Sequence, residues 1–144
     1  MGKVVLLSCV SKKRAVRSKA KDMYISPLFK YNYKYAKSMN PDKIFVLSAE
    51  YGLLGIDQEI EPYNKTLNTM SMKDIKTWAD DVLGSLEQKT DIKRDEFIFL
   101  AGERYRKYLL PHLVHTEIPL KGLGIGKQLG FLKKKVTHYE QRML

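Results

Sequence analysis

The sequence predicts an α/β protein, organised as a three-layer α/β/α sandwich around a mostly parallel sheet of about four strands. Three apolar runs, at residues 3–8, 43–47 and 96–101, have the continuous aliphatic and aromatic composition of strands that are buried on both faces. Segments with helical periodicity separate these runs, which is the order that right-handed β–α–β crossovers require. A shorter fourth strand at residues 114–118 is expected at an edge of the sheet.

The length and composition fit a single domain over residues 1–144. A chain of 144 residues can bury a core without disulfides or a metal. Cys9 is the one cysteine, which excludes an intramolecular disulfide and favours a reducing compartment. No segment resembles a signal peptide or reaches the roughly 20 apolar residues of a membrane span. We therefore expect a cytoplasmic protein with no membrane partner, while the oligomeric state is left open.

The charge balance indicates the class of partner. The chain has 26 Lys and Arg against 16 Asp and Glu, a formal net charge of +10. Such an excess favours polyanions, with nucleic acid or a nucleotide first among them. The alternative is a lysine-rich surface that is merely solvated. Charge predicts a partner and not a reaction.

The loop after the first strand combines hydroxyls, a thiol and cations. Ser8 and Cys9 are followed by Ser11, Lys12 and Lys13, a chemistry that resembles a phosphate- or sugar-binding loop without the glycines of a P-loop. Cys9 is either a nucleophile activated by the neighbouring lysines or a small buried residue at a strand end. Ser8, Cys9, Lys12 and Lys13 are candidate substrate-binding residues.

A basic segment and a helix lead to the second strand. Residues 15–24 are expected to form an exposed loop or short helix whose cations could follow a phosphate backbone. The next helix begins with Ser26 as its N-cap and Pro27 as its first residue, and it ends near Met39. Its apolar stripe comprises Leu28, Tyr31, Tyr35, Ala36 and Met39. A lysine row on another face, either solvated or in contact with nucleic acid, comprises Lys30, Lys34 and Lys37.

The second strand ends in the main candidate site. Ser48, Glu50, Tyr51 and Gly52 replace the apolar residues of the strand abruptly. Ligands of α/β proteins are held where the carboxyl ends of parallel strands meet, so this change of composition indicates a binding site. The alternative is a turn in which Gly52 takes a positive φ and the following leucines return to the core.

The following loop, residues 54–67, adds further candidate groups. It has no clear helical or strand periodicity, and loops of this length are often functional. Pro62 biases the preceding residue toward an extended backbone, which fixes the directions of Glu61 and Tyr63. Both residues are therefore candidate site residues.

A second amphipathic helix follows from its N-cap Ser71. Asp74 stands at the capping-box spacing. Its apolar stripe comprises Ile75, Trp78, Ala79, Val82, Leu83 and Leu86. Trp78 on this stripe is interpreted as a core residue.

The third strand is followed by Gly102, which either lets a ligand approach or permits a tight turn, and a helix at residues 103–110. Pro111 ends that helix. His112 and His115 have no third ligand at a recognisable spacing, so neither a metal site nor a cofactor is predicted.

The last segment is rich in glycine. Lys121, Gly122 and Gly124 offer a cation and an accessible backbone to a ligand. A final helix is expected from about Leu129 to Tyr139. Its apolar face comprises Ile125, Leu129, Leu132 and Val136.

Several of these segments carry a resemblance to a known family. Ser48-x-x-Tyr51-Gly52-Leu53-Leu54 with Ile60-x-Pro62-Tyr63 resembles the signature of the YaaA-type proteins and of their shorter bacterial and phage relatives. Ser8-Cys9-x-x-Lys12-Lys13 and Gly122-Leu123-Gly124-Ile125-Gly126 match the shorter relatives. The resemblance implies an α/β fold distantly like that of uracil-DNA glycosylases, and DNA binding as in the YaaA branch. The chain lacks the acidic catalytic loop of true uracil-DNA glycosylases, which argues against straightforward uracil excision.

These observations together predict a nucleic-acid- or nucleotide-directed enzyme that acts at a nucleobase or N-glycosidic bond. Glu50 is the first candidate for a general base or electrostatic stabiliser, and Glu61 is the second. Tyr51 and Tyr63 would stack on or hydrogen-bond the base. The phosphate would be held by Lys12, Lys13 and Lys121. The site is expected where the ends of the three strands bring together Ser8-Cys9, Ser48-Glu50-Tyr51 and Gly102-Glu103 at one edge of the sheet.

Two alternatives from other classes remain. One is a non-catalytic DNA- or RNA-binding module that depends on Arg14, Arg17 and Lys19 and not on Glu50, which would then be a surface carboxylate or an ion-pair partner. The other is a hydrolase or sensor of a small nucleotide, for which long polyanions would compete poorly.

Overall fold

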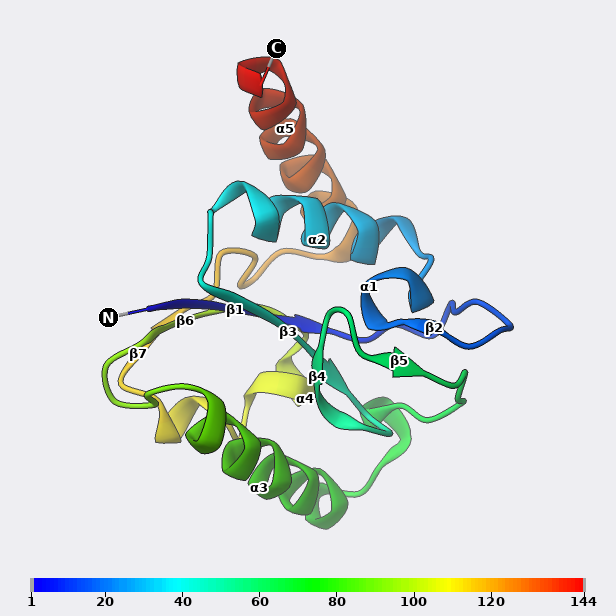
Figure 1. Cartoon of the computed structure of the whole chain (residues 1–144), viewed down its shortest axis with the longest axis vertical. Helices are drawn as coiled ribbons and strands as arrows, with labels where there is room; N and C mark the ends of the chain where they lie inside the picture. The colour runs from blue at the N-terminus through cyan, green and yellow to red at the C-terminus, as the bar shows by residue number, and fades with distance from the viewer. Residues whose placement is uncertain (1, 144) are drawn as a thin grey trace.

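The computed structural model describes residues 2–143 and shows a mixed sheet with helices on both faces (Figure 1). The sheet has five strands in the order β4-β3-β1-β6-β7. Their bounds are β1 Lys3–Ser8, β3 Lys43–Ser48, β4 Gly52–Gly55, β6 Glu96–Leu100 and β7 His115–Glu117. The β1–β3, β1–β6 and β6–β7 pairs are parallel, and β4 pairs antiparallel with β3. The predicted α/β class with a mostly parallel sheet is confirmed, and β7 is the expected edge strand.

The helices form two layers. α2 (Pro27–Ser38) and α5 (Ile125–Met143) cover one face of the sheet, while α3 (Met72–Lys89) and the short α4 (Glu103–Arg106) lie on the other (Figure 1). The smaller elements are β2 Ser18–Lys19, α1 Ala20–Met23, β5 Glu59–Ile60 and the 3-10 turns η1 Leu67–Thr69 and η2 Leu110–His112. β2 and β5 pair as a separate two-stranded sheet. Within residues 2–143, no helix combines the length and apolar character needed to cross a membrane.

β1 lies at the centre of the sheet and of the core. It is hydrogen-bonded to β3 on one side and to β6 on the other. Its residues from Val4 to Leu7 are at most 1% exposed, because helices cover both faces. This explains why the centre of the strand is continuously apolar instead of alternating with polar residues.

α2 begins as the sequence predicts, but it packs on two sides. The Ser26 hydroxyl accepts a hydrogen bond from the Phe29 N–H at 3.2 Å, as an N-cap does. The buried side chains are those of Phe29, Asn32 and Ala36, and the rest of the predicted stripe is only partly buried. α5 lies against α2, and Tyr35 packs edge-on against Phe131 with ring centroids 5.8 Å apart. The single predicted stripe therefore did not include Phe29 and Asn32, although both are buried.

α3 follows the prediction closely. The Ser71 hydroxyl accepts from the Asp74 N–H at 3.1 Å, and all six residues of the predicted stripe are buried. The Trp78 indole N–H donates to the Ser48 carbonyl at 2.8 Å. Trp78 is thus a core residue, as expected, and it joins α3 to the end of β3.

Three predicted boundaries are wrong. The helix expected at residues 103–110 ends at Arg106, and a separate 3-10 turn contains Pro111. α5 begins at Ile125, so the last glycine of the glycine-rich segment is helical. The loop expected at residues 54–67 includes the end of β4 and all of β5. β4 was missed because an antiparallel edge strand of four residues is too short to show periodicity.

The turn into β4 depends on Gly52. Its φ of +73° lies in the left-handed region, which side chains with a Cβ disfavour by about 1–2 kcal/mol. The interpretation of Gly52 as a turn residue therefore fits the structure better than a role in ligand contact. Beyond it, Leu53 and Leu54 return to the core.

Gly52→Ala is expected to lower the free energy of unfolding by about 1–2 kcal/mol, because the left-handed backbone is strained for alanine. Urea unfolding measures the change. Gly55→Ala is the matched control at the other end of β4, where φ is not positive and an added Cβ meets no atom within 4 Å. A change within about 0.5 kcal/mol is expected there. Equal losses in both variants would contradict this explanation.

Candidate functional site

The topology of the sheet creates a crevice between β1 and β6. From β1 the chain passes through α2 on one face to β3. From β3 it passes through α3 on the opposite face to β6, on the other side of β1 (Figure 1). β6 is followed by α4, which lies on the same face as α3, so the connections that leave β1 and β6 diverge to opposite faces (Figure 1). Open α/β sheets bind ligands at such a switch point, outside the carboxyl ends of the strands.

A cleft of about 740 Å³ occupies this position. Ser8 and Cys9 line it from the end of β1, and Gly102 lines it from the end of β6. α2 and α5 contribute residues from one face, including Asn32 and Gln128, while α4 contributes from the other. The structure thus confirms that Ser8, Cys9 and Gly102 share one hollow.

The α4 side of the cleft is cationic. Arg104, Arg106 and Lys107 line it together with a single carboxylate, Glu103. Two of these cations also have protein partners: Arg104 Nη1 donates to Asn68 Oδ1 at 3.3 Å, and Arg106 Nη1 donates to the Ala101 carbonyl at 2.7 Å. Three cations and one carboxylate leave this wall positive, which favours an anionic ligand.

Cys9 lies at the floor of the cleft and is 7% exposed. Its thiol donates to the Tyr105 hydroxyl at 3.3 Å, and that hydroxyl also accepts from the Leu67 N–H at 3.3 Å. Burial raises the pKa of Tyr105 to about 12, so the hydroxyl stays protonated at neutral pH. These contacts fit the interpretation of Cys9 as a buried packing residue, and its role as a nucleophile stays a prediction.

Ser48 organises a polar network beside β3, outside the cleft. Its side chain is fully buried, and its hydroxyl accepts from the N–H groups of Glu50 (3.2 Å) and Tyr51 (3.0 Å). It donates to the Tyr63 hydroxyl at 2.9 Å, and Tyr63 is hydrogen-bonded to Tyr24 at 2.7 Å. Burial is the main cause that raises the pKa values of Tyr24 and Tyr63. Ser48 and Tyr63 therefore hold the turn after β3 in place.

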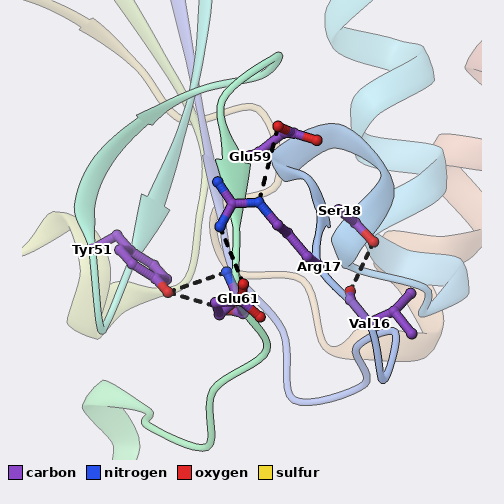
Figure 2. A network of polar contacts seen from close by, with 6 residues as sticks. All are labelled: Val16, Arg17, Ser18, Tyr51, Glu59 and Glu61. Atoms are coloured by element: carbon purple, nitrogen blue, oxygen red, sulfur yellow. Dashed lines mark hydrogen bonds and ion pairs between the residues drawn. The ribbon is translucent and has the colours of Figure 1, made fainter.

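Glu61 and Tyr51 belong to a second, exposed network (Figure 2). The Tyr51 hydroxyl accepts from the Glu61 N–H at 3.2 Å and donates to the Glu61 carbonyl at 3.3 Å. Arg17 pairs with the Glu61 carboxylate at 3.1 Å and approaches that of Glu59 at 3.9 Å. Glu61 thus has a cationic partner, and Arg17, one of the expected phosphate contacts, has two carboxylate neighbours.

The expectation that Glu50 shares a hollow with Cys9 and Gly102 is wrong. The Glu50 side chain is exposed and does not line the cleft. The reason is the strand order: β1 separates β3 from β6, so the end of β3 lies on the far side of β1 from the crevice. A catalytic role for Glu50 stays a prediction without support from this geometry.

The other predicted lysines and glycines also lie outside the lining of the cleft. Lys12 is exposed, and Lys13 is half-buried with its Nζ 4.4 Å from the centre of the Tyr63 ring. Burial lowers the pKa of Lys13. Lys121, Gly122 and Gly124 are exposed, although their neighbours Leu120 and Ile125 line the cleft. The glycine-rich segment therefore flanks the cleft.

Sequence reasoning missed most of the polar lining. The residues concerned are Asn32, Asn68, Arg104, Arg106, Lys107 and Gln128. A signal existed for the cationic group, because it directly follows Gly102 and Glu103, which the strand-end rule had already placed at this edge of the sheet. Asn32 could also have been noticed, because it is a polar residue within a buried helix face. Among residues 2–143, no three His, Cys, Asp or Glu side chains gather closely enough to hold a metal ion.

A comparison with known protein families identifies the family of this chain. Residues 4–134 match the family described as "Family of unknown function (DUF6884)". The chain belongs to this family. A search of curated proteins finds no match. The family match extends from β1 into α5 and therefore includes every element that lines the cleft.

Ser48→Ala is expected to lower the free energy of unfolding by about 2 kcal/mol, because it leaves the Glu50 and Tyr51 N–H groups without their acceptor. Urea unfolding measures the loss. Ser11→Ala is the control, since Ser11 is exposed, and a change within about 0.5 kcal/mol is expected. A Ser48→Ala protein as stable as the parent would contradict a structural role for this hydroxyl.

Stability is expected to fall as the pH rises from about 10 to about 12. The folded pKa of Tyr105 is raised from 10.0 to about 12, so in this window the unfolded chain loses the proton while the folded protein keeps it. The stabilisation is fully present below pH 10. Urea midpoints measured across the window test this, with Tyr105→Phe as the comparison. If Tyr105→Phe leaves the slope unchanged, Tyr105 does not contribute to it.

Proposed function

We propose that the cleft between β1 and β6 binds a nucleotide unit, either free or within a nucleic acid, and that the protein acts on its base or N-glycosidic bond. The observation that supports this most is the pairing of a cationic wall with a buried amide at a topological switch point. A sequence with a net charge of +10 adds to the preference for such a ligand. A fold like that of the uracil-DNA glycosylases and a cytoplasmic location are part of the same proposal.

The cationic wall supplies the phosphate contacts. Arg104 and Lys107 are exposed on this wall, so their side chains can reach a phosphate, whereas Arg106 is engaged with a main-chain carbonyl. Ser8 and Ser11 add hydroxyl donors from the end of β1. The cleft volume of about 740 Å³ falls within the range of about 300–1,000 Å³ that is usual for small-ligand sites.

The carboxylate for the chemistry is Glu103. It takes the role expected for Glu50, because it lines the cleft beside the cations. A carboxylate in this position orients a water or stabilises the positive charge that develops on the sugar as an N-glycosidic bond breaks. Apolar residues from the opposite wall, including Leu28 and Leu120, would lie against the base.

Lys107→Glu is expected to weaken binding of a nucleoside monophosphate about 10-fold or more, because a hydrogen bond to a charged group is lost and a repulsion is added. For a short oligonucleotide, the dependence of log affinity on log salt should become shallower by about 1. Isothermal titration calorimetry at two salt concentrations measures both effects. Lys121→Glu, the same charge change outside the cleft, is the control. Equal losses in the two variants would indicate general charge attraction instead of a site.

Glu103→Gln is expected to abolish release of the free base while binding stays within about threefold, because the amide keeps the shape and loses the charge. Chromatography of nucleosides and oligonucleotides incubated with the protein measures release. Glu50→Gln is the comparison and should leave turnover unchanged. The opposite result, with turnover lost only in Glu50→Gln, would restore Glu50 as the catalytic carboxylate.

A second candidate is a non-catalytic nucleic-acid- or nucleotide-binding module. It is favoured by the positions of Glu50 and Glu61, which both lie outside the cleft. It predicts binding without base release and no effect of Glu103→Gln on any activity. A preference for mononucleotides over long oligonucleotides would instead favour a small-nucleotide hydrolase or sensor.

A further inference from the structure

Asn32 is a buried polar side chain of the cleft whose side-chain oxygen is unpaired. It projects from the middle of α2, lines the cleft and is 7% exposed. Its Oδ1 is buried and has no hydrogen-bond partner among the residues that the structure describes. Gln128, the other carboxamide on the helical walls, donates to the Leu123 carbonyl at 2.8 Å and is therefore occupied.

An unpaired buried carboxamide is costly for folding. The residues beside it on the same helix side, Phe29 and Ala36, are buried and apolar, and an apolar residue would fit this position without the loss of a hydrogen bond. A buried polar group is normally hydrogen-bonded, and the exceptions call for an explanation. The position of Asn32 on the cleft offers an explanation, because a bound ligand can supply the missing hydrogen-bond partner.

We propose that Asn32 is the specificity-determining residue of the cleft, and that its carboxamide pairs with the hydrogen-bonding edge of a nucleobase. This inference rests on the proposed function. A carboxamide presents an acceptor and a donor side by side, and so it matches a planar edge that carries a neighbouring donor and acceptor. The cations of α4 on the opposite wall hold the phosphate, so the two ends of a nucleotide are recognised by different walls.

If Asn32 reads the base, Asn32→Leu should raise the stability of the free protein and lower its affinity for the nucleotide. Asn32→Leu removes the unpaired group and keeps the branching and the number of heavy atoms of the side chain, so the free protein should melt about 3 °C higher or more. The same variant should bind the preferred nucleoside monophosphate about 5-fold to 150-fold more weakly, because the paired edge is lost. Asn64→Leu is the matched control on an exposed loop and should change neither quantity.

The experiment uses the full chain. Thermal melts are recorded without ligand, and calorimetry then measures the affinity for each of the four common nucleoside monophosphates. The wild-type protein is also tested with analogues of these nucleotides that are methylated on the hydrogen-bonding edge of the base. This second measurement needs no variant, so it holds even if Asn32→Leu fails to fold. Methylation should weaken the preferred nucleotide by the same 5-fold to 150-fold.

The outcomes separate the two proposals. A more stable Asn32→Leu protein with weakened binding supports the role of Asn32. Unchanged affinity of a folded Asn32→Leu protein, or indifference of the wild-type protein to methylation, would overturn that role while leaving nucleotide binding by the cleft intact. If the wild-type protein binds none of the nucleotides or oligonucleotides, the proposed function fails, and the role of Asn32 in reading a base fails with it.

Discussion

The burial of β1 between β3 and β6 is the constraint on which the rest of the structure depends. Its four central residues are almost fully excluded from water, and it makes two of the three parallel pairings of the sheet. Because the chain adds β3 on one side of β1 and β6 on the other, the connections from β1 and β6 diverge to opposite faces. The cleft is thus a consequence of strand order, and its floor is fixed by the strand that is most deeply buried.

The fold was largely predictable because its main signals are strong and local. The runs at β1, β3 and β6 have continuous apolar centres, and the stripe of α3 from Ile75 to Leu86 repeats over about three turns, with a hydroxyl cap at Ser71. The edge strand β4 was not predictable in this way. It exists because Gly52 permits the turn and because β3 offers it an unpaired edge, and only the second of these is a property of the assembled sheet.

The candidate site was only partly predictable, because the ends of strands can be located from sequence but their order cannot. Ser8, Cys9 and Gly102 come together since β1 and β6 are neighbours. Glu50 follows a strand that the sequence predicts equally well. However, β3 lies on the other side of β1 from β6, so the end of β3 is away from the crevice. Asn32 was also not predicted, because its position on the wall of the cleft depends on which face of the sheet α2 covers.

Ser48 and Cys9, which belong to two of the segments that resemble YaaA-type proteins, are connected through the core. Ser48 ties the turn after β3 to Tyr63, and its carbonyl accepts from the Trp78 indole. The Trp78 ring packs edge-on against Tyr105 with centroids 5.7 Å apart, and Tyr105 accepts from the Cys9 thiol at the floor of the cleft. A continuous chain of contacts thus connects the end of β3 to the end of β1. Because each member is buried or hydrogen-bonded, this chain gives the cleft a rigid floor, and a rigid floor is what lets a few side chains on the walls discriminate between ligands.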